Sequence, residues 1–196
     1  MLYSTARAVL RFIFHLMGLK AEGLENLPLS GAVIIASNHV SNWDPVVVAV
    51  ALSRPIHYMA KASLFKYKIA DRLFTSVNAF PVRRGIPDRK AIRRALQVLE
   101  DGNVLGIFPE GARNTTGDMK AQAGVAMIAL KSGAPIVPVA CLGTGHILPC
   151  GWFAPLVVRV GEPIYLDEYQ GQRVGSAGME KISGDIMIKI NCLLSK

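Results

Sequence analysis

The chain has 196 residues, of which 51% are hydrophobic, and its formal net charge is +8 at pH 7. This length suits one domain with a substantial core. Aromatic residues make up only 7% of the chain, which argues against a single-stranded nucleic-acid binder, because such proteins interleave aromatic with basic residues. Basic charge with high hydropathy instead indicates an anionic membrane surface or a phosphorylated ligand. The three cysteines, Cys141, Cys150 and Cys192, have no zinc-site spacing, so we expect reduced thiols.

The N-terminal residues 2–18 have the periodicity of an amphipathic helix. Polar residues recur at three- or four-residue steps and form one narrow stripe: Ser4, Arg7, Arg11 and His15. The segment is shorter than the ~20 apolar residues that span a bilayer. We therefore expect an interfacial helix over residues 1–20, with Arg7 and Arg11 reaching lipid phosphates, before a single domain over residues 21–196. Packing of the helix on that domain is the alternative, and the two arrangements are compatible.

A histidine and an aspartate follow the first buried strand. The β-branched run 32–36 predicts that strand, and Asp44 is expected to cap a helix over residues 45–52. The loop between them carries His39, at the kind of strand end where α/β proteins hold their chemistry. An imidazole can remove a proton from an alcohol, and a carboxylate on its other nitrogen fixes the tautomer. The alternative is that Asp44 only caps the helix and His39 only occupies a turn.

Residues 54–80 mix basic side chains with bulky apolar ones. After a strand at 56–60, the pattern is typical of short helices that line an apolar groove and touch acidic head groups. A solvated pair of amphipathic helices explains the pattern equally well. The residues expected to line the groove are Leu64, Phe65, Leu73 and Phe74.

Two arginines, Arg83 and Arg84, stand in a segment bounded by Pro81 and Gly85, which we interpret as a cationic loop. Asp88 then caps a helix over residues 89–101. Its polar face is also basic, and most of those side chains are better explained as a solubilising surface. The two loop arginines are better placed for a ligand.

Another strand at 104–108 runs into Pro109-Glu110-Gly111-Ala112-Arg113. Glycine lets the main chain approach a ligand, and the arginine fork matches phosphate. An ordinary strand–loop turn with a surface salt bridge is the alternative. The remaining predicted elements are a helix at 121–132, a strand at 135–141 whose Pro138 indicates an edge or a bulge, a strand at 156–160 and a helix at 179–194.

Four motifs in a fixed order carry a resemblance: N-H-x-x-x-x-D, F-P-V-R-R-G, F-P-E-G-A-R-N and I-V-P-V. Over residues 20–165 the chain resembles the glycerolipid acyltransferase family, and within it the bacterial enzymes that acylate 1-acyl-sn-glycerol-3-phosphate. Where that family's third motif has Thr and Ser, this chain has Ala112 and Asn114, which removes one possible hydroxyl donor. The resemblance assigns the general base to His39 with Asp44 as its partner, and acceptor-phosphate binding to Arg83, Arg84, Glu110, Gly111 and Arg113.

The resemblance also implies a reaction and a fold. The reaction is direct transfer of a fatty acyl group from acyl-CoA or acyl carrier protein to the 2-hydroxyl of lysophosphatidate, without a cofactor or a metal. Main-chain N–H groups of the 39–44 loop or of the helix start at residue 45 are candidate oxyanion donors. We expect a single α/β domain with a mixed, largely parallel sheet flanked by helices, on the cytoplasmic face of the cell membrane as a peripheral or monotopic protein. The alternatives are another acceptor (glycerol 3-phosphate or another lysolipid), a non-catalytic lipid-binding module, and a hydrolase.

Overall fold

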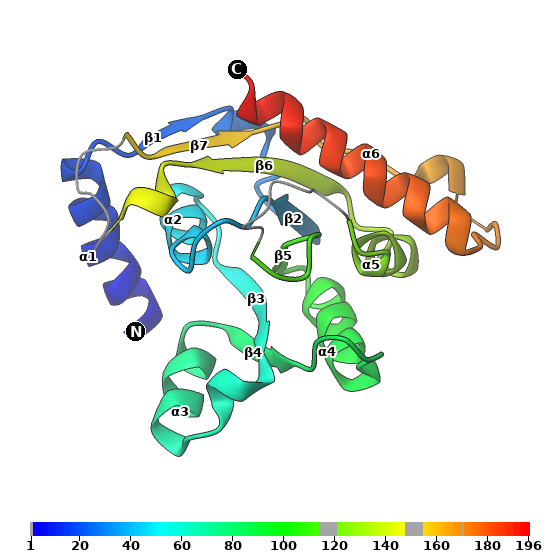
Figure 1. Ribbon diagram of the computed structural model, residues 1–196, viewed down its shortest axis with the longest axis horizontal. Coiled ribbons are helices and arrows are strands. Elements are labelled where there is room, and N and C mark those ends of the chain that lie inside the picture. Colours follow the sequence, from blue (N-terminus) through cyan, green and yellow to red (C-terminus); the bar gives the residue numbers. More distant parts are fainter. Residues whose placement is uncertain (1, 114–120, 148–154, 170) are drawn as a thin grey trace.

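A seven-stranded sheet, flanked by helices on both faces, organises the computed structural model (Figure 1). The structure describes residues 2–113, 121–147, 155–169 and 171–196; Asn114 and Cys150 lie outside them. The strands are β1 (Lys20–Glu22), β2 (Val33–Ser37), β3 (Ile56–Lys61), β4 (Ala79–Val82), β5 (Val104–Ile107), β6 (Ile136–Leu142) and β7 (Val157–Val160). The α-helices are α1 (Leu2–Leu16), α2 (Asp44–Ala51), α3 (Lys68–Ser76), α4 (Arg89–Glu100), α5 (Gly124–Ser132) and α6 (Ser176–Leu194), and short 3-10 turns cover Leu24–Asn26, Ala62–Phe65, Thr144–His146 and Asp167–Tyr169.

The spatial order of the strands is β1-β7-β6-β2-β5-β3-β4, and every pairing is parallel except that of β6 with β7. The predicted single α/β domain with a mixed, largely parallel sheet is therefore confirmed. The central strand β2 lies between β5 and β6. Because parallel neighbours end at the same edge of a sheet, the segments that follow β2, β5 and β6 come together there.

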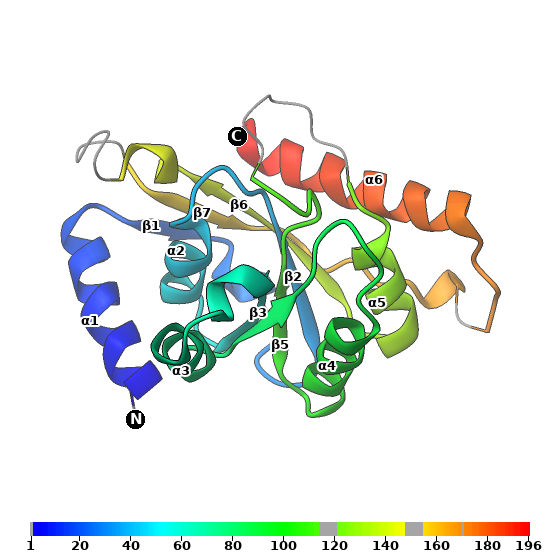
Figure 2. The same cartoon turned by 60° about the horizontal axis from the view of Figure 1, so that its bottom comes forward.

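Both faces of the sheet are covered, as Figures 1 and 2 show. Alternate residues of β2 point to opposite sides, since side chains in a strand have a period of two. Val33 and Ile35 belong to the core beneath α1 and α2, whereas Ile34 and Ala36 belong to the core beneath α4, α5 and α6. All five residues of β2 are buried, which explains the apolar run from Val33 to Ala36.

Three expectations about local structure are corrected. Residues 79–82 form strand β4, paired with β3, so the arginine loop begins only at Arg83. Strand β6 is interior, so of the two predictions for Pro138 the edge is wrong. β7 pairs with β6 only from Val139 onward, and a separate bridge joins Ile136 to Ile164, so the ladder is interrupted at Pro138 as the alternative, a bulge, implies. Asp44 is the first residue of α2 and not its N-cap, because its carboxylate turns back to the preceding loop.

Helix α1 packs on α2 and also leaves an apolar face exposed. Phe14 is buried and meets Trp43 edge-to-face at a ring-centroid distance of 6.1 Å. The guanidinium of Arg7 donates to the main-chain oxygens of Ala49 and Leu52 at the end of α2, so the expectation that Arg7 reaches lipid phosphates is wrong. The exposed large side chains of this helix are Val9, Phe12, Ile13 and Leu16. Among the helices that the structure describes, none combines the length and apolar character needed to cross a membrane.

Candidate active site

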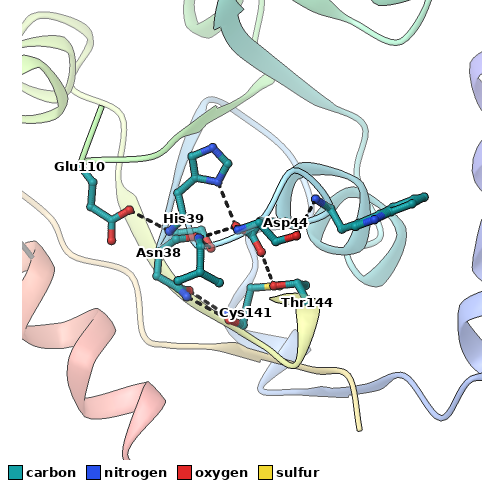
Figure 3. A network of polar contacts seen from close by, with 10 residues as sticks. Asn38, His39, Asp44, Glu110, Cys141 and Thr144 are labelled. Carbon is teal, nitrogen blue, oxygen red and sulfur yellow. Dashed lines mark hydrogen bonds and ion pairs between the residues drawn. The ribbon is translucent and has the colours of Figure 1, made fainter. Parts of the chain in front are cut away.

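The carboxyl edge of the sheet brings together side chains from three neighbouring strands (Figure 3). His39 follows β2, Glu110 follows β5, and Thr144 follows β6. His39 Nδ1 lies 2.9 Å from Asp44 Oδ2, and Asp44 is fully buried. A carboxylate at this distance favours the tautomer that carries its proton on Nδ1, which leaves the lone pair of Nε2 free to accept a proton.

The carboxylate of Asp44 is held by four donors. Oδ2 accepts a hydrogen bond from the His39 ring at 2.9 Å. It also accepts from the main-chain N–H groups of Val40 and Ser41, both at 2.7 Å. Oδ1 accepts the hydroxyl proton of Thr144. The N–H groups of Val40 and Ser41 are thereby occupied, so they do not serve as the oxyanion donors that we expected from this loop.

A stack of aromatic rings fixes the plane of the imidazole. The rings of His39 and Phe108 stack with centroids 4.2 Å apart, and Phe108 stacks in turn on Tyr58 at 5.8 Å. Gly106 makes room for the Tyr58 ring, because a Cβ there would lie 2.5 Å from Tyr58 Cδ1. Burial raises the pKa of the Tyr58 phenol well above its usual value, so this ring stays neutral.

Two further contacts fix the main chain around His39. Its N–H donates to Glu110 Oε2 at 2.9 Å. Asn38 bridges to strand β6: its Nδ2 donates to the Cys141 carbonyl oxygen at 2.9 Å, and its Oδ1 accepts from the Cys141 N–H at 2.7 Å. Burial raises the pKa of the Cys141 thiol, which keeps it neutral beside the negative Asp44.

The His39 ring lies in the wall of a mostly apolar cavity of about 540 Å³. Helices α1, α2 and α3 and strand β3 enclose it, and Arg84 and Lys61 bring positive charge to the same space. Of the expected groove residues, Leu64 and Phe74 line this cavity. Phe65 packs against Phe74 at 5.5 Å, and Leu73 is exposed.

Of the arginines predicted to bind phosphate, one lines the cavity and two do not. Arg84 lines the cavity with His39, whereas Arg83 is exposed and its Nε lies 3.3 Å from Asp88 Oδ2. Hydrogen bonds from the Arg83 main chain, and then from Ala91, help to lower the pKa of Asp88 and keep it charged. Gly111 has a φ of 72°, which turns the chain after Glu110, and Arg113 is exposed beyond it. Among the described residues, neither Arg83 nor Arg113 lines the cavity.

Sequence reasoning did not find Thr144, Phe108 or the bridge from Asn38 as parts of this site. Asn38 and Phe108 are the first residues of two of the motifs, but nothing local shows which atoms they contact. Thr144 lies one hundred residues from Asp44 in the chain, and only the order of the strands brings the two together.

Comparisons with known proteins agree with this architecture. The Acyltransferase family matches residues 18–142. The 1-acyl-sn-glycerol-3-phosphate acyltransferase of Bacillus subtilis is 33% identical over 86% of this chain and 85% of its own length. The protein of that name from Borreliella burgdorferi is also 33% identical, over 71% of this chain and 58% of its own length. The crystal structure of the 1-acyl-sn-glycerophosphate (LPA) acyltransferase PlsC from Thermotoga maritima superposes with a TM-score of 0.70 at 24% identity, covering 98% of this chain and 83% of that one. The chain therefore belongs to the acyltransferase family.

Proposed function

We propose that the chain transfers a fatty acyl group from an acyl thioester to the 2-hydroxyl of 1-acyl-sn-glycerol-3-phosphate, which gives phosphatidic acid. The observation that carries the proposal is His39, bound to a buried carboxylate and placed in the wall of an apolar cavity of about 540 Å³. The names of the relatives, 1-acyl-sn-glycerol-3-phosphate acyltransferase, support this acceptor.

In the proposed reaction His39 acts as the general base. As the acceptor oxygen attacks the thioester carbon, its proton passes to Nε2, and Asp44 stabilises the imidazolium that forms. The tetrahedral intermediate then collapses, the carbon–sulfur bond breaks, and the imidazolium returns the proton to the departing thiolate. Such general-base help contributes about 10²–10⁴-fold to the rate.

Acceptor phosphate is assigned first to Arg84, because it lines the same cavity as His39. Its guanidinium can bind phosphate with two parallel hydrogen bonds and so place the hydroxyl against Nε2. Arg83 and Arg113 are exposed and are assigned to the approach of the anionic head group. Glu110 is assigned to support of the His39 main chain, since a carboxylate repels phosphate.

The acyl chain is assigned to the apolar part of the cavity, between Leu10 of α1, Val46 of α2 and Phe74 of α3. Exposing one methylene to water costs ~0.8 kcal/mol, so moving ten methylenes from the bilayer into water costs roughly 8 kcal/mol. Direct passage of the chain from the bilayer into the cavity avoids that cost. This favours a cavity that opens toward lipid.

We further propose that the exposed apolar residues of α1 and of the α3 region rest on the cytoplasmic face of the cell membrane. Both segments border the cavity, and Figure 2 shows the start of α1 beside α3. On the α3 side, exposed Leu64, Tyr67, Ile69 and Leu73 alternate with Lys66, Lys68 and Arg72, which suits an anionic interface. The protein would then be peripheral or monotopic, with access to acyl-CoA or acyl carrier protein.

The test is an assay of purified protein in mixed micelles with lysophosphatidate and, in separate reactions, palmitoyl-CoA or palmitoyl-acyl carrier protein. Glycerol 3-phosphate replaces lysophosphatidate in a further reaction, to identify the acceptor. The variant His39→Ala should lose at least 10²-fold in kcat and still bind lysophosphatidate. His146→Ala is the matched control, because His146 is an exposed histidine that does not line the cavity.

The outcomes separate the assignments. Turnover retained by His39→Ala, or lost by His146→Ala, would overturn His39 as the base. Arg84→Gln should raise KM for lysophosphatidate. Arg89→Gln should not, because Arg89 is an exposed arginine of α4 that does not line the cavity. Equal effects of these two changes would refute a specific phosphate contact by Arg84.

A further inference from the structure

The second oxygen of the Asp44 carboxylate has its own donor. While Oδ2 faces the His39 loop, Oδ1 faces the end of β6 and accepts the hydroxyl proton of Thr144, as Figure 3 shows. Asp44 and Thr144 both have 0% of their surface exposed. Within the part of the chain that the structure describes, Thr144 is the one donor to Oδ1.

The main chain around Thr144 is built to hold this hydroxyl in place. The preceding Gly143 has a φ of 83°, and a Cβ there would overlap the main-chain oxygen of Pro155. A side chain is therefore excluded at 143 both by conformation and by space. Asn38 fixes the N–H and the carbonyl of Cys141, three residues before Thr144, to the start of the catalytic loop. The two ends of the Asp44–Thr144 contact thus belong to one rigid unit.

The hydroxyl determines the orientation of the carboxylate. Three donors converge on Oδ2, and one hydrogen bond to Oδ1 fixes the rotation of the carboxylate about its last torsion. Without that donor, Oδ1 is a buried charged oxygen with an unmet hydrogen bond, and the carboxylate loses the contact that opposes its rotation from the Oδ1 side. A turn of the carboxylate moves Oδ2 away from His39 Nδ1 and releases the imidazole ring.

We propose that Thr144 is a positioning residue of the acyl transfer, whose hydroxyl orients Asp44 and through it the Nδ1–H of His39. The inference rests on the proposed function, because it takes His39 as the base. Thr144 contacts Asp44, is fully buried and does not line the cavity, so it acts on the rate of the chemical step and not on acceptor binding.

The experiment compares Thr144→Val, Thr144→Ser and Thr144→Cys in the lysophosphatidate assay. Valine has the shape of threonine without the donor, and should lower kcat by about 10- to 100-fold with KM for lysophosphatidate unchanged. Serine restores the donor and should keep kcat within about threefold of the parent protein, whereas the weak S–H donor of cysteine should give an intermediate kcat. Ser183→Ala is the matched control, because it removes from α6, on the opposite face of the sheet, a fully buried hydroxyl that has no hydrogen-bond partner among the described residues.

A spectroscopic readout separates positioning from a general loss of stability. In protein labelled with ¹⁵N-histidine, the Nδ1–H proton in a hydrogen bond to a carboxylate gives a downfield ¹H resonance, which His39→Ala assigns by removing it. Thr144→Val should shift or broaden that resonance, and Ser183→Ala should leave it unchanged. The same resonance in Thr144→Val as in the parent protein would show a merely structural role and overturn the proposal.

The remaining outcomes are also decisive. If Thr144→Val has the parent kcat while His39→Ala is inactive, the positioning role is refuted and the proposed function stands. If His39→Ala is active, the proposed function fails and the inference fails with it. If Thr144→Val does not fold, serine and cysteine decide, because equal kcat values for these two variants would contradict a role for the hydrogen bond.

Discussion

Asn38 is the residue at which the cost of a substitution follows most directly from the structure. Its side chain satisfies both main-chain groups of Cys141, at 2.9 Å and 2.7 Å, and all of these atoms belong to buried residues. In Asn38→Ala the N–H and the carbonyl of Cys141 lose their partners. Each buried unsatisfied group costs about 1–3 kcal/mol, so we expect a loss of roughly 4 kcal/mol in the free energy of unfolding. For a chain of this size that loss lowers Tm by roughly 10 °C.

The assay is thermal and urea unfolding of the purified protein in detergent micelles, followed by tryptophan fluorescence. Asn26→Ala is the matched control, since Asn26 makes one partly exposed hydrogen bond, to the Val160 oxygen at 3.0 Å. It should cost about 1 kcal/mol. Asn38→Asp keeps the acceptor for the Cys141 N–H but sets an oxygen against the Cys141 carbonyl, so it should be at least as unstable as Asn38→Ala. If Asn38→Ala loses no more stability than Asn26→Ala, the account of this bridge is wrong.

Three other predictions concern the cavity and the titrating groups. A Cβ in Gly106→Ala would lie 2.5 Å from Tyr58 Cδ1, so the ring must shift toward the cavity. The kcat/KM values should then favour shorter acyl-CoA donors. An unchanged ratio of kcat/KM for a short and a long acyl-CoA would contradict this prediction. Iodoacetamide at pH 8 should alkylate exposed Cys192 in the folded protein and Cys141 only after denaturation, because burial raises the pKa of the Cys141 thiol; peptide mass spectrometry checks the order. Burial lowers the pKa of His57 from 6.5, so below that pH the unfolded chain binds more protons than the folded protein and stability falls as the pH decreases. His57→Gln should therefore flatten the dependence of Tm on pH between 6.5 and 5. An equal slope in both proteins would refute this prediction.

Several local features follow from the sequence because their causes are local. The β-branched run before His39 predicts β2, and Asp88 caps α4 with hydrogen bonds from the N–H groups of Lys90 and Ala91. The separation of His39 and Asp44 by four residues allows their contact within one loop. Family membership likewise follows from motif order, since each motif is a short contiguous segment.

Other expectations failed where a distant contact overrides a local preference. Asp44 has the sequence context of an N-cap, but the ring of His39 and the hydroxyl of Thr144 offer its carboxylate stronger partners. Arg7 occupies the polar stripe of an amphipathic helix, but the unpaired carbonyls at the end of α2 lie within its reach. In both cases the observed partner is a buried or partly buried polar group that needs a hydrogen bond.

The sequence by itself determined the chemistry available to this protein: an imidazole, its carboxylate, and the arginines of two loops. The tertiary structure decided how these groups are supported, because the strand order places β2 between β5 and β6. That order brings Glu110 to the main chain of His39 from one side and Thr144 to Asp44 from the other. Pairing between strands far apart in the chain depends on the packing of the whole sheet, and no short segment encodes it.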